Sequence, residues 1–367
     1  MKSYKYLWDD FISDENIKLA ISNSAKGKKR KRRKDVKFAL EHTEEYIQHI
    51  KEYAMDYKNK HHEPKVIYDG ISRKKRTIIV PSFDELVVQH MIVQVLQPMF
   101  LKGTYEHAYG SIPKRGAHKG KSYIEKWIRN DTKNCKYCLK LDIKHYFESI
   151  PHDRLKEKLS KYIKDKKILS VLFEIIDVID IGLPLGFYTS QWLSMWYLKN
   201  IDHVIKEQSY APHYIRYMDD IVIFGANKRK LWKTYEFICE ILKHDGLKLN
   251  NKRQLFRFSY FKNSKEYGRQ LDFMGFCFHR DRTVLRRGIY YKMCRKAHKI
   301  SAKEKPTIYE LRQMMSYLGW IKSTDIYNSY LQYVKPFFSF QKAKRRISKN
   351  DRRNNYVETI RINSKAA

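Results

Sequence analysis

Two adjacent acidic residues interrupt an otherwise apolar segment in the second half of the chain. Asp219 and Asp220 follow Tyr217 and Met218 and precede the apolar run 221–224. Because Asp is disfavoured in strands and favoured in tight turns, the pattern predicts a β-hairpin with Met218 and Asp219 near its tip. A carboxylate pair on rigid backbone can bind divalent metal for phosphoryl chemistry. Taken alone, an Asp-Asp pair is more often a surface turn.

A third carboxylate ends another predicted strand. Asp142 follows the apolar run 137–141 and precedes Ile143. On its own it is equally well interpreted as a turn residue, but a carboxylate at the end of a buried strand is costly unless something binds it. With Asp219 and Asp220 it gives three carboxylates on two neighbouring strands. Two Mg²⁺ ions held about 3.5–4 Å apart by such groups can activate a 3′-hydroxyl and stabilise leaving pyrophosphate.

The net charge indicates a polyanionic partner. The 367 residues include 75 Lys and Arg against 40 Asp and Glu, a formal net charge of +35. Such an excess repels itself unless a polyanion neutralises it, so we expect a nucleic-acid partner. A ribosome-bound or membrane-surface protein could share this charge. The 28 Tyr, 18 Phe and 6 Trp favour nucleic acid, because aromatic rings interleaved with cations suit base stacking.

The remaining composition limits the class of protein. No apolar run reaches membrane-spanning length and the N-terminus lacks the apolar core of a signal peptide, so we expect a soluble, cytoplasmic protein without a membrane partner. Five scattered Cys argue against a disulfide framework. Cys135 and Cys138 form a lone C-x-x-C, which we interpret as two buried or strand-flanking thiols rather than a zinc site.

Hydrophobic periodicity predicts a mixture of helices and short strands around these carboxylates. Ser82 and Asp84 are candidate N-caps for an apolar helix. The basic run 26–34 is interpreted as either solvated or phosphate-binding, and the polar end from Lys342 as frayed. Helices are predicted at 1–22, 36–58, 153–179, 190–205, 228–244 and after 286, and strands at 65–81, 137–143, 214–224, 247–249 and 273–278.

Several segments, in their order and spacing, resemble the motifs of a reverse transcriptase. The resemblance covers roughly residues 65–290 and implies an α+β right-hand polymerase with a small antiparallel palm sheet and a helical thumb. The segments are 141–147, 182–191 and 214–220 for the palm, 271–276 for the primer grip, Arg73–Pro81 for the fingers strands, Tyr109, Gly110, Gly116 and His118 for a further fingers motif, and 317–320 for a short thumb.

The resemblance also implies a role for individual residues. Asp142, Asp219 and Asp220 would bind two Mg²⁺ ions, for which Mn²⁺ can substitute, and Ile143 would offer its backbone to the second metal. Phe147 would lie under the sugar and reject a 2′-hydroxyl by its bulk. The implied nucleotide-binding set is Lys74, Arg76, Phe147, Leu185, Gly186, Gln191 and Lys252, with Lys75 an alternative to Lys74 and Lys248 an alternative to Lys252 as the acid that protonates pyrophosphate. The implied primer grip is Phe273, Met274 and Gly275.

By the same resemblance, the chain divides into the parts of a right hand. Fingers with a basic N-terminal segment are expected at 1–135, and a palm at 136–285 with a helical fingers insertion at 153–181. A helical, basic thumb is expected at 286–345 and a flexible basic tail at 346–367. Too few residues follow 286 for a thumb together with a full maturase and endonuclease module, which disfavours a group II intron protein.

Two departures from the commonest motif indicate a subgroup. Many family members carry Gln where this chain has Leu185, and Ser-Pro where it has Ser190 and Gln191. The pattern looks most like reverse transcriptases of diversity-generating retroelements and of related bacterial groups, some of which act in antiphage defence. In the retroelement group, loss of the Gln is associated with error-prone copying of template adenines, because an apolar contact fixes the pairing less well than a hydrogen bond.

The expected function is therefore synthesis of cDNA from an RNA template and dNTPs in a bacterial retroelement, with an RNA–DNA hybrid in the cleft. A stable non-coding RNA and a basic or acidic accessory protein are further candidate partners. The alternatives are a defence enzyme acting on a non-coding RNA, an untemplated or protein-primed polymerase on the same palm, and a nucleic-acid-binding scaffold with a relic site.

Overall fold

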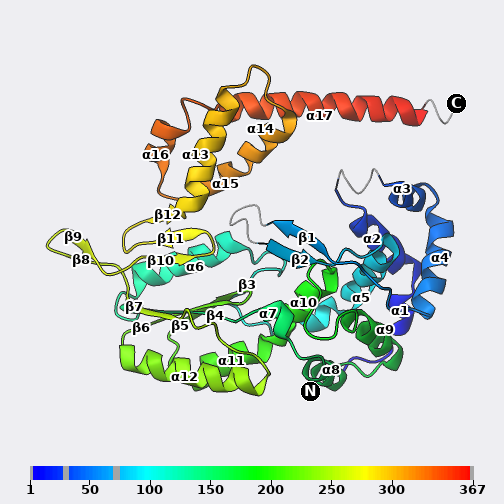
Figure 1. The fold of residues 1–367 in the computed structure, drawn as a ribbon, viewed down its shortest axis with the longest axis horizontal. Coiled ribbons are helices and arrows are strands. Elements are labelled where there is room, and N and C mark those ends of the chain that lie inside the picture. Colours follow the sequence, from blue (N-terminus) through cyan, green and yellow to red (C-terminus); the bar gives the residue numbers. More distant parts are fainter. Residues whose placement is uncertain (1–2, 28–32, 69–74, 364–367) are drawn as a thin grey trace. The chain divides into compact units, whose positions relative to one another are not determined.

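The computed structural model describes residues 3–27, 33–68 and 75–363, with side chains up to residue 353 (Figure 1). It divides into two compact units, each described by itself. The N-terminal unit comprises residues 1–120 and 133–256, and the C-terminal unit comprises residues 121–132 and 257–367. Within the described residues, no helix is long and apolar enough to cross a membrane.

A buried helix, α5 (Phe83–Leu101), is at the centre of the helical part of the N-terminal unit. Its start follows the predicted N-cap, because Ser82 Oγ accepts a hydrogen bond from Glu85 N and Glu85 Oε2 accepts one from Ser82 N. Helices α2, α4 and α10 pack against it, which explains why apolar residues lie on all its sides. The surrounding helices are α1 (Trp8–Phe11), α2 (Asp14–Ser24), α3 (Lys34–Glu41), α4 (Thr43–Met55), α7 (Tyr146–Ser149), α8 (His152–Tyr162), α9 (Lys166–Ile176), α10 (Tyr188–Tyr197), α11 (Lys199–Gln208) and α12 (Lys228–His244).

A five-stranded sheet forms the other part of this unit, in the order β3-β5-β6-β4-β7. Strands β5 and β6 form the predicted antiparallel hairpin, β4 pairs antiparallel with β6, and the short edge strand β3 runs parallel to β5. Helix α12 packs against β4 and β6 (Figure 1). The strands are β3 (Ala108–Tyr109), β4 (Tyr137–Asp142), β5 (His213–Tyr217), β6 (Asp220–Gly225) and β7 (Gln254–Arg257).

The predicted strands at 65–81 form a separate antiparallel hairpin of β1 (Lys65–Tyr68) and β2 (Lys75–Ile78). The turn predicted at residues 69–70 and most of the basic stretch at 73–76 lie outside the described residues. Cys135 and Cys138, one before β4 and one inside it, are both buried, as predicted for strand-flanking thiols.

The C-terminal unit combines two small antiparallel sheets with a group of helices. A three-stranded sheet has the order β10-β11-β12, and a two-stranded hairpin is formed by β8 and β9. Helix α6 (Ala117–Asn130) contributes residues 121–130 to this unit. The other elements are β8 (Tyr260–Lys262), β9 (Lys265–Tyr267), β10 (Leu271–Phe273), β11 (Phe276–Phe278), β12 (Thr283–Leu285), α13 (Arg287–Ser301), α14 (Ile308–Met315), α15 (Tyr317–Lys322), α16 (Tyr327–Tyr333) and α17 (Phe340–Asn363).

Two predicted strands differ from what the structure shows. The run 273–278 is split by a turn, because Met274 and Gly275 have φ values of 53° and 88°, a conformation that ends one strand and starts the next. The strand predicted at 247–249 is reduced to a single antiparallel bridge between Leu249 and Ile143. The first difference arises from a turn, whose backbone angles hydrophobic alternation does not encode.

The C-terminal segment also differs from the sequence-based expectation. Residues 346–363, expected to form a flexible tail, continue helix α17. The first half of that helix packs against α14, and Arg312 forms an ion pair with Asp351. Ile347 packs against the core of this unit. Tertiary contacts therefore hold the helix as far as Asp351, although the polar composition of this segment alone indicates disorder.

Candidate active site

The strand register brings two of the three predicted carboxylates side by side. Asp142, the last residue of β4, lies directly opposite Asp220, the first residue of β6. On its other side Asp220 is paired with Tyr217 at the end of β5. Directly opposite residues project from the same face of a sheet. The carboxylates of Asp142 and Asp220 are therefore neighbours at one end of the sheet, as the sequence predicts.

Asp219 occupies the two-residue turn that joins β5 and β6. Its neighbour Met218 has a φ of 56°, in the left-handed region that non-glycine residues rarely adopt. Two hydrogen bonds hold the backbone of Met218 in this conformation: Met218 N donates to Tyr109 O at 3.0 Å, and Met218 O accepts from Arg216 Nη1 at 2.8 Å. Asp219 O accepts from Ile143 N at 3.3 Å, which links the turn to the end of β4.

A buried ion pair supports the hairpin from behind. Arg216 and Asp202 have exposed fractions of 1% and 0%, and the guanidinium donates to both carboxylate oxygens, at 2.6 and 2.5 Å. Tyr214 OH donates to the same carboxylate at 2.6 Å. Burial lowers the pKa of Arg216, but Asp202 outweighs it and the pKa is raised overall. Arg216 is therefore charged, and its remaining donor fixes the carbonyl of Met218.

The electrostatics of the turn favour a bound cation. Burial raises the pKa of Asp219, and repulsion from Asp142 raises it further, while Arg76 and Arg216 act in the opposite direction. Asn250, which the sequence analysis did not identify, donates from Nδ2 to Asp142 Oδ2 at 3.1 Å and from N to Asp142 O at 2.7 Å. This amide orients one carboxylate without neutralising it, so the repulsion between the acidic groups persists.

The donor set fits Mg²⁺, although it does not form a closed cage. Among the described residues, no group of three or more His, Cys, Asp and Glu side chains is already gathered as a metal site. Mg²⁺ in phosphoryl-transfer enzymes usually takes one or two carboxylates and completes its shell with substrate phosphates and water. Paired Asp142 and Asp220, with Asp219 in the adjoining turn, suit that arrangement.

A cavity of about 240 Å³ in the N-terminal unit gathers most of the predicted nucleotide-binding residues. It includes Met218 of the turn, and His90 and Tyr188 stack on one of its walls with ring centres 3.9 Å apart. Four predicted residues share this cavity although they come from two segments some 40 positions apart. The lining residues are Leu86, His90, Phe147, Leu185, Gly186, Phe187, Tyr188, Ser190, Gln191 and Met218.

Backbone contacts hold the two segments of the cavity together. Phe147, in the short helix after β4, accepts a hydrogen bond at its carbonyl from Leu183 N at 2.6 Å. Gly182 has a φ of +86°, and a Cβ there would lie 2.5 Å from the same carbonyl oxygen. The close approach thus requires glycine, and it places Phe147 beside the loop that carries Leu185 and Gly186.

A second glycine connects the cavity with hairpin β1–β2. Leu185 O accepts from Ile79 N at 2.7 Å, and a Cβ on Gly186 would lie 2.1 Å from Ile79 O. Gly186 also has a φ of +114°, so no other residue fits both its conformation and its surroundings. Arg76 lies in β2 of this hairpin, and its positive charge acts to lower the pKa of Asp219, so this cation is within electrostatic reach of the turn.

The other predicted site residues are not brought into this cavity. Lys74 lies outside the described residues. Lys252 and Lys248 are both exposed, and Lys252 N donates to Asn250 Oδ1 at 3.2 Å. Phe273, Met274 and Gly275, the predicted primer grip, form the β10–β11 turn of the C-terminal unit.

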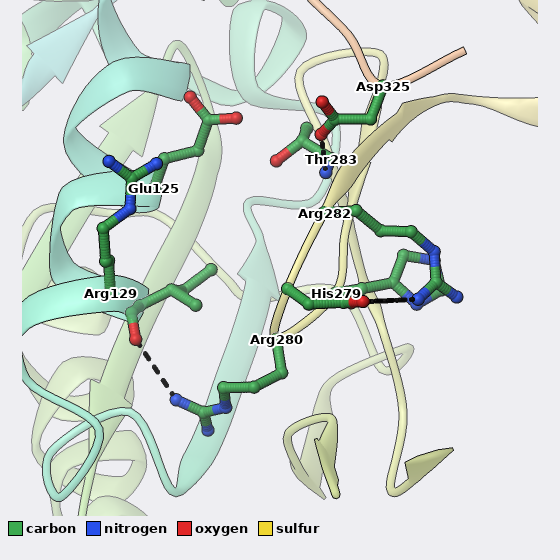
Figure 2. Close-up of a pocket in the computed structure, with 9 residues that line it drawn as sticks. Glu125, Arg129, His279, Arg280, Arg282, Thr283 and Asp325 are labelled. Carbon is green, nitrogen blue, oxygen red and sulfur yellow. Dashed lines mark hydrogen bonds and ion pairs between the residues drawn. The ribbon is translucent and has the colours of Figure 1, made fainter. Parts of the chain in front are cut away.

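A second cavity, of about 200 Å³, lies within the C-terminal unit (Figure 2). Arg280 Nη1 donates to Ile128 O at 3.4 Å, which connects this part of the chain to α6. Asp325 accepts from Thr283 N at 2.8 Å. The lining contains Arg129, Arg280 and Arg282 together with Glu125, Asp281 and Asp325, so its formal charges balance, and we assign this cavity no binding role.

Comparison with known proteins identifies the family. The model of the family described as "Reverse transcriptase (RNA-dependent DNA polymerase)" matches residues 58–278, more than half of the chain. The chain belongs to the reverse transcriptase family. The matched region contains all three carboxylates and the whole nucleotide cavity. Members of this family generally use divalent metal ions, which agrees with the donor set at the turn.

Individual relatives of this chain are distant. It is 27% identical over 186 residues to the "Retron Ec73 reverse transcriptase" of Escherichia coli, covering 45% of this chain and 56% of that one. It is 28% identical over 152 residues to an "Uncharacterized 91 kDa protein in cob intron" of Schizosaccharomyces pombe, covering 39% and 18% of the two chains. The match therefore spans less than two thirds of the length of these relatives.

The fold of this family member also resembles a solved structure. Apo telomerase from Candida tropicalis superimposes with a TM-score of 0.51 and 14% sequence identity, covering 80% of this chain and 60% of that one. At this identity the likeness concerns the fold alone, and it confirms the predicted α+β fold of a right-hand polymerase.

Sequence reasoning missed the residues that position the turn. Arg216 could have been identified from the sequence, because a charged residue inside the predicted strand at 214–217 requires a buried partner of opposite charge. Nothing in the sequence indicated that the partner is Asp202. Tyr109, part of the expected fingers motif, is in edge strand β3 of the carboxylate-bearing sheet, where it pairs with Tyr217.

Proposed function

We propose that this chain is an RNA-directed DNA polymerase that makes cDNA by metal-assisted nucleotidyl transfer. One observation carries the proposal: the register of β4 and β6 sets Asp142 beside Asp220, with Asp219 in the adjoining turn and the nucleotide cavity next to Met218. A paired carboxylate site next to a cavity for a nucleotide is what transfer of a nucleotide to a 3′-hydroxyl requires.

Each residue has a role in this proposal. Asp142, Asp219 and Asp220 would hold two Mg²⁺ ions, with the backbone of Ile143 as a further ligand; when bound, the metal activates the 3′-hydroxyl and stabilises the leaving pyrophosphate. Phe147 would exclude ribonucleotides by its bulk. The nucleotide would be held by the set Arg76, Lys74, Leu185, Gly186, Gln191 and Lys252, and the primer by Phe273, Met274 and Gly275.

The parts of the right hand follow from the same proposal. Residues 1–135 and the helices at 153–181 would be fingers, 136–285 the palm and 286–345 the thumb. The five-stranded sheet agrees with a palm, and edge strand β3 at 108–109 is best counted with it. The net charge of +35 supports an RNA template and an RNA–DNA hybrid as partners, held through their backbones.

We further propose that copying is error-prone, as in a diversity-generating retroelement. The supporting observation is Leu185, which lines the nucleotide cavity where many family members carry Gln. An apolar side chain there cannot hydrogen-bond to the nucleotide or template. Without that contact, we expect more frequent misincorporation opposite template adenines.

A second candidate role is antiphage defence with a non-coding RNA, or polymerisation without a conventional template. It is favoured by the similarity to a retron reverse transcriptase. The two roles differ in their partners, because the first needs a template repeat and an accessory protein, whereas the second needs a structured RNA or a partner toxin. Sequencing the RNA and cDNA that copurify with the chain distinguishes them.

The polymerase proposal is tested by primer extension. Purified protein, Mg²⁺, dNTPs and an RNA template with a DNA primer are expected to give full-length DNA. The variant Asp219→Asn with Asp220→Asn is expected to give none while binding the same hybrid. Extension by both proteins, or by neither on any template, would contradict the proposal. Product made without template and attached to a Tyr would indicate the protein-primed alternative, and biological function that survives both substitutions would indicate a scaffold with a relic site.

A further inference from the structure

The β8–β9 hairpin of the C-terminal unit presents an unusual surface. Its register pairs Tyr260 with Tyr267 and Lys262 with Lys265. Directly paired residues lie on the same face of a hairpin, and alternate residues of a strand share a face. The four side chains therefore lie together, and we refer to Tyr260, Lys262, Lys265 and Tyr267 as the aromatic-cationic face. The two Tyr rings are stacked, with centres 5.9 Å apart and planes at 30°.

The opposite face of the hairpin is fixed to the rest of the unit. It carries Phe261 and Glu266, which are paired with each other. Glu266 accepts from Ser259 Oγ at 2.6 Å and from Arg282 Nη2 at 2.8 Å, and it lies 2.7 Å from His279 Nδ1. Glu266 is the only acidic residue between positions 257 and 269. The aromatic-cationic face therefore has no acid of its own.

The hairpin is held in shape at both ends. Asn263 and Ser264 at its tip have φ values of 49° and 62°, as in the two-residue turns that match the twist of a hairpin. At its base, Ser259 N donates to Arg269 O at 3.0 Å, and a Cβ on Gly268 would lie 2.6 Å from Phe258 O. The hairpin therefore loses little conformational entropy when a ligand binds to it.

The face combines the two features that bind unpaired nucleic acid. Tyr267 is 46% exposed, so a ring is available for a base. Lys262 and Lys265 are exposed beside it, and no acidic partner within the described chain is paired with either. Arg257 places its guanidinium 4.6 Å from the Tyr260 ring centre and adds a third cation.

The simplest alternative is that the Lys residues only protect strand edges from pairing with another chain. That would account for Lys262 and Lys265, but it gives no reason for a stacked, partly exposed Tyr pair on the same face, two positions further from the tip. Stacked aromatic rings flanked by cations suit successive bases joined by phosphates. An acidic peptide would use the cations and leave the rings unused.

We infer that the aromatic-cationic face binds single-stranded RNA, with bases stacking on its Tyr rings and phosphates contacting its Lys side chains. The inference rests on the proposed function in one respect, that RNA is the strand presented unpaired, whereas product DNA is paired in the hybrid. It adds an RNA contact that uses neither the carboxylates nor the nucleotide cavity.

Binding of a fluorescent, unstructured 20-nucleotide RNA to the full chain tests the inference. Tyr267→Ala is expected to weaken binding about five- to ten-fold, because one stacked base is lost. Tyr267→Phe is expected to retain wild-type affinity, because the ring remains. The double variant Lys262→Ala with Lys265→Ala is expected to make the slope of log K against log salt concentration shallower by about 1.4. This is the value for two lost phosphate contacts to a single strand.

Matched controls come from elsewhere on the surface. Phe261 is 44% exposed but lies on the opposite face, so Phe261→Ala is expected to leave the affinity unchanged. Lys161 and Lys164 are exposed in and just after α8, and their double Ala variant removes the same charge. A salt dependence that falls equally in both double Lys variants would overturn the assignment to this face.

A second measurement separates this inference from the polymerase proposal. Extension by one nucleotide on a short hybrid with a one-nucleotide overhang is expected to be unchanged in the hairpin variants, because no free strand is present. RNA binding that is unaffected by Tyr267→Ala and by the Lys pair, in a chain that extends primers, overturns the hairpin inference alone. Hairpin-dependent RNA binding in a chain that never extends primers supports the inference and overturns the polymerase proposal. Greater dependence on the face for single-stranded DNA than for RNA would also contradict it.

Discussion

Arg216 and Asp202 form a fully buried, two-bond ion pair directly behind the turn that carries Asp219. The pair leaves one donor of Arg216 for the carbonyl of Met218. Because two charges are buried together with all their partners satisfied, the position of the turn is determined by this pair and not by the strand ends alone.

Removing one partner of this pair is expected to destabilise the N-terminal unit. Asp202→Asn should lower its free energy of unfolding by about 3–5 kcal/mol, because Arg216 is left buried without a counter-charge. Tyr214→Phe, which removes one hydrogen bond to Asp202, should cost about 1 kcal/mol. Urea unfolding measures both. The exposed pair of Lys156 and Asp177 is the control, since Asp177→Asn should cost less than about 1 kcal/mol.

Milder substitutions at the same pair should affect catalysis more than stability. Arg216→Lys keeps a charge but cannot bind Asp202 and the Met218 carbonyl together. We expect kcat for primer extension to fall by about 100-fold with little change in KM for dNTP, because the carboxylates are misplaced by a small distance. A wild-type kcat in this variant would show that the turn does not depend on the ion pair.

Metal binding at the turn is expected to stabilise the folded chain. Adding Mg²⁺ should raise the melting temperature of the wild type, because the cation relieves the repulsion between Asp142 and Asp219. Asp219→Asn should melt no lower than wild type without metal, show no rise with Mg²⁺ and lose about 100- to 1,000-fold in primer extension. Thermal unfolding over a Mg²⁺ titration, with EDTA as the metal-free reference, measures the difference. An equal rise in both proteins would exclude Asp219 as a ligand.

Gly186 is expected to be intolerant of any side chain. Gly186→Ala places a Cβ 2.1 Å from Ile79 O and forces an unfavourable φ, so hairpin β1–β2 with Arg76 must shift. We expect KM for dNTP to rise at least about ten-fold, because a triphosphate contact moves away from the cavity. Gly288→Ala is the control, since a Cβ there meets nothing within 4 Å. Equal dNTP kinetics in the two variants would contradict the proposed link.

The identity of residue 185 is expected to set copying accuracy. Leu185→Gln restores a polar group in the cavity and should lower misincorporation opposite template adenine by about ten-fold, with smaller effects at other bases. Sequencing of cDNA made from one RNA template by both proteins measures the change. Leu40, which is 41% exposed in α3, provides the control Leu40→Gln, for which no change is expected. An unchanged adenine error rate in Leu185→Gln would remove the argument for error-prone copying.

Glu266 is expected to make the β8–β9 hairpin sensitive to acid. Partial burial raises the pKa of Glu266, but hydrogen bonds from Ser259, His279 and Arg282 outweigh it and lower the pKa to about 2. Because the pKa of Glu266 is lower in the folded chain than the unfolded value of 4.5, its carboxylate stabilises the fold at pH values above 4.5. This contribution is lost as the pH falls from 4.5 towards 2.

Allowing for its exposure to solvent, we expect Glu266 to contribute about 1 kcal/mol at pH 7. Hydrogen exchange at the hairpin amides should be faster in Glu266→Gln than in wild type at neutral pH, and the two should converge as the pH approaches 2. A difference that stays constant from pH 7 to pH 3 would show that the carboxylate charge is not what holds the hairpin.

The sequence by itself determined the three carboxylates, the β5–β6 hairpin and the capped helix at Ser82. These features depend on local preferences, since acidic residues at the end of an apolar run and a capping residue before a helix can be recognised from a few neighbouring positions. The motif spacing also identified the segments that line the nucleotide cavity.

Only the tertiary structure decided how these segments are held. The pairing of Arg216 with Asp202, the hydrogen bond from Asn250 to Asp142 and the approach of Gly186 to Ile79 join residues far apart in the chain. A single sequence does not encode which distant partner satisfies a buried charge or which backbone approaches a glycine. The register of β8 with β9 is likewise a three-dimensional fact, and it alone separates Tyr267 and the two Lys from Glu266 on the opposite face.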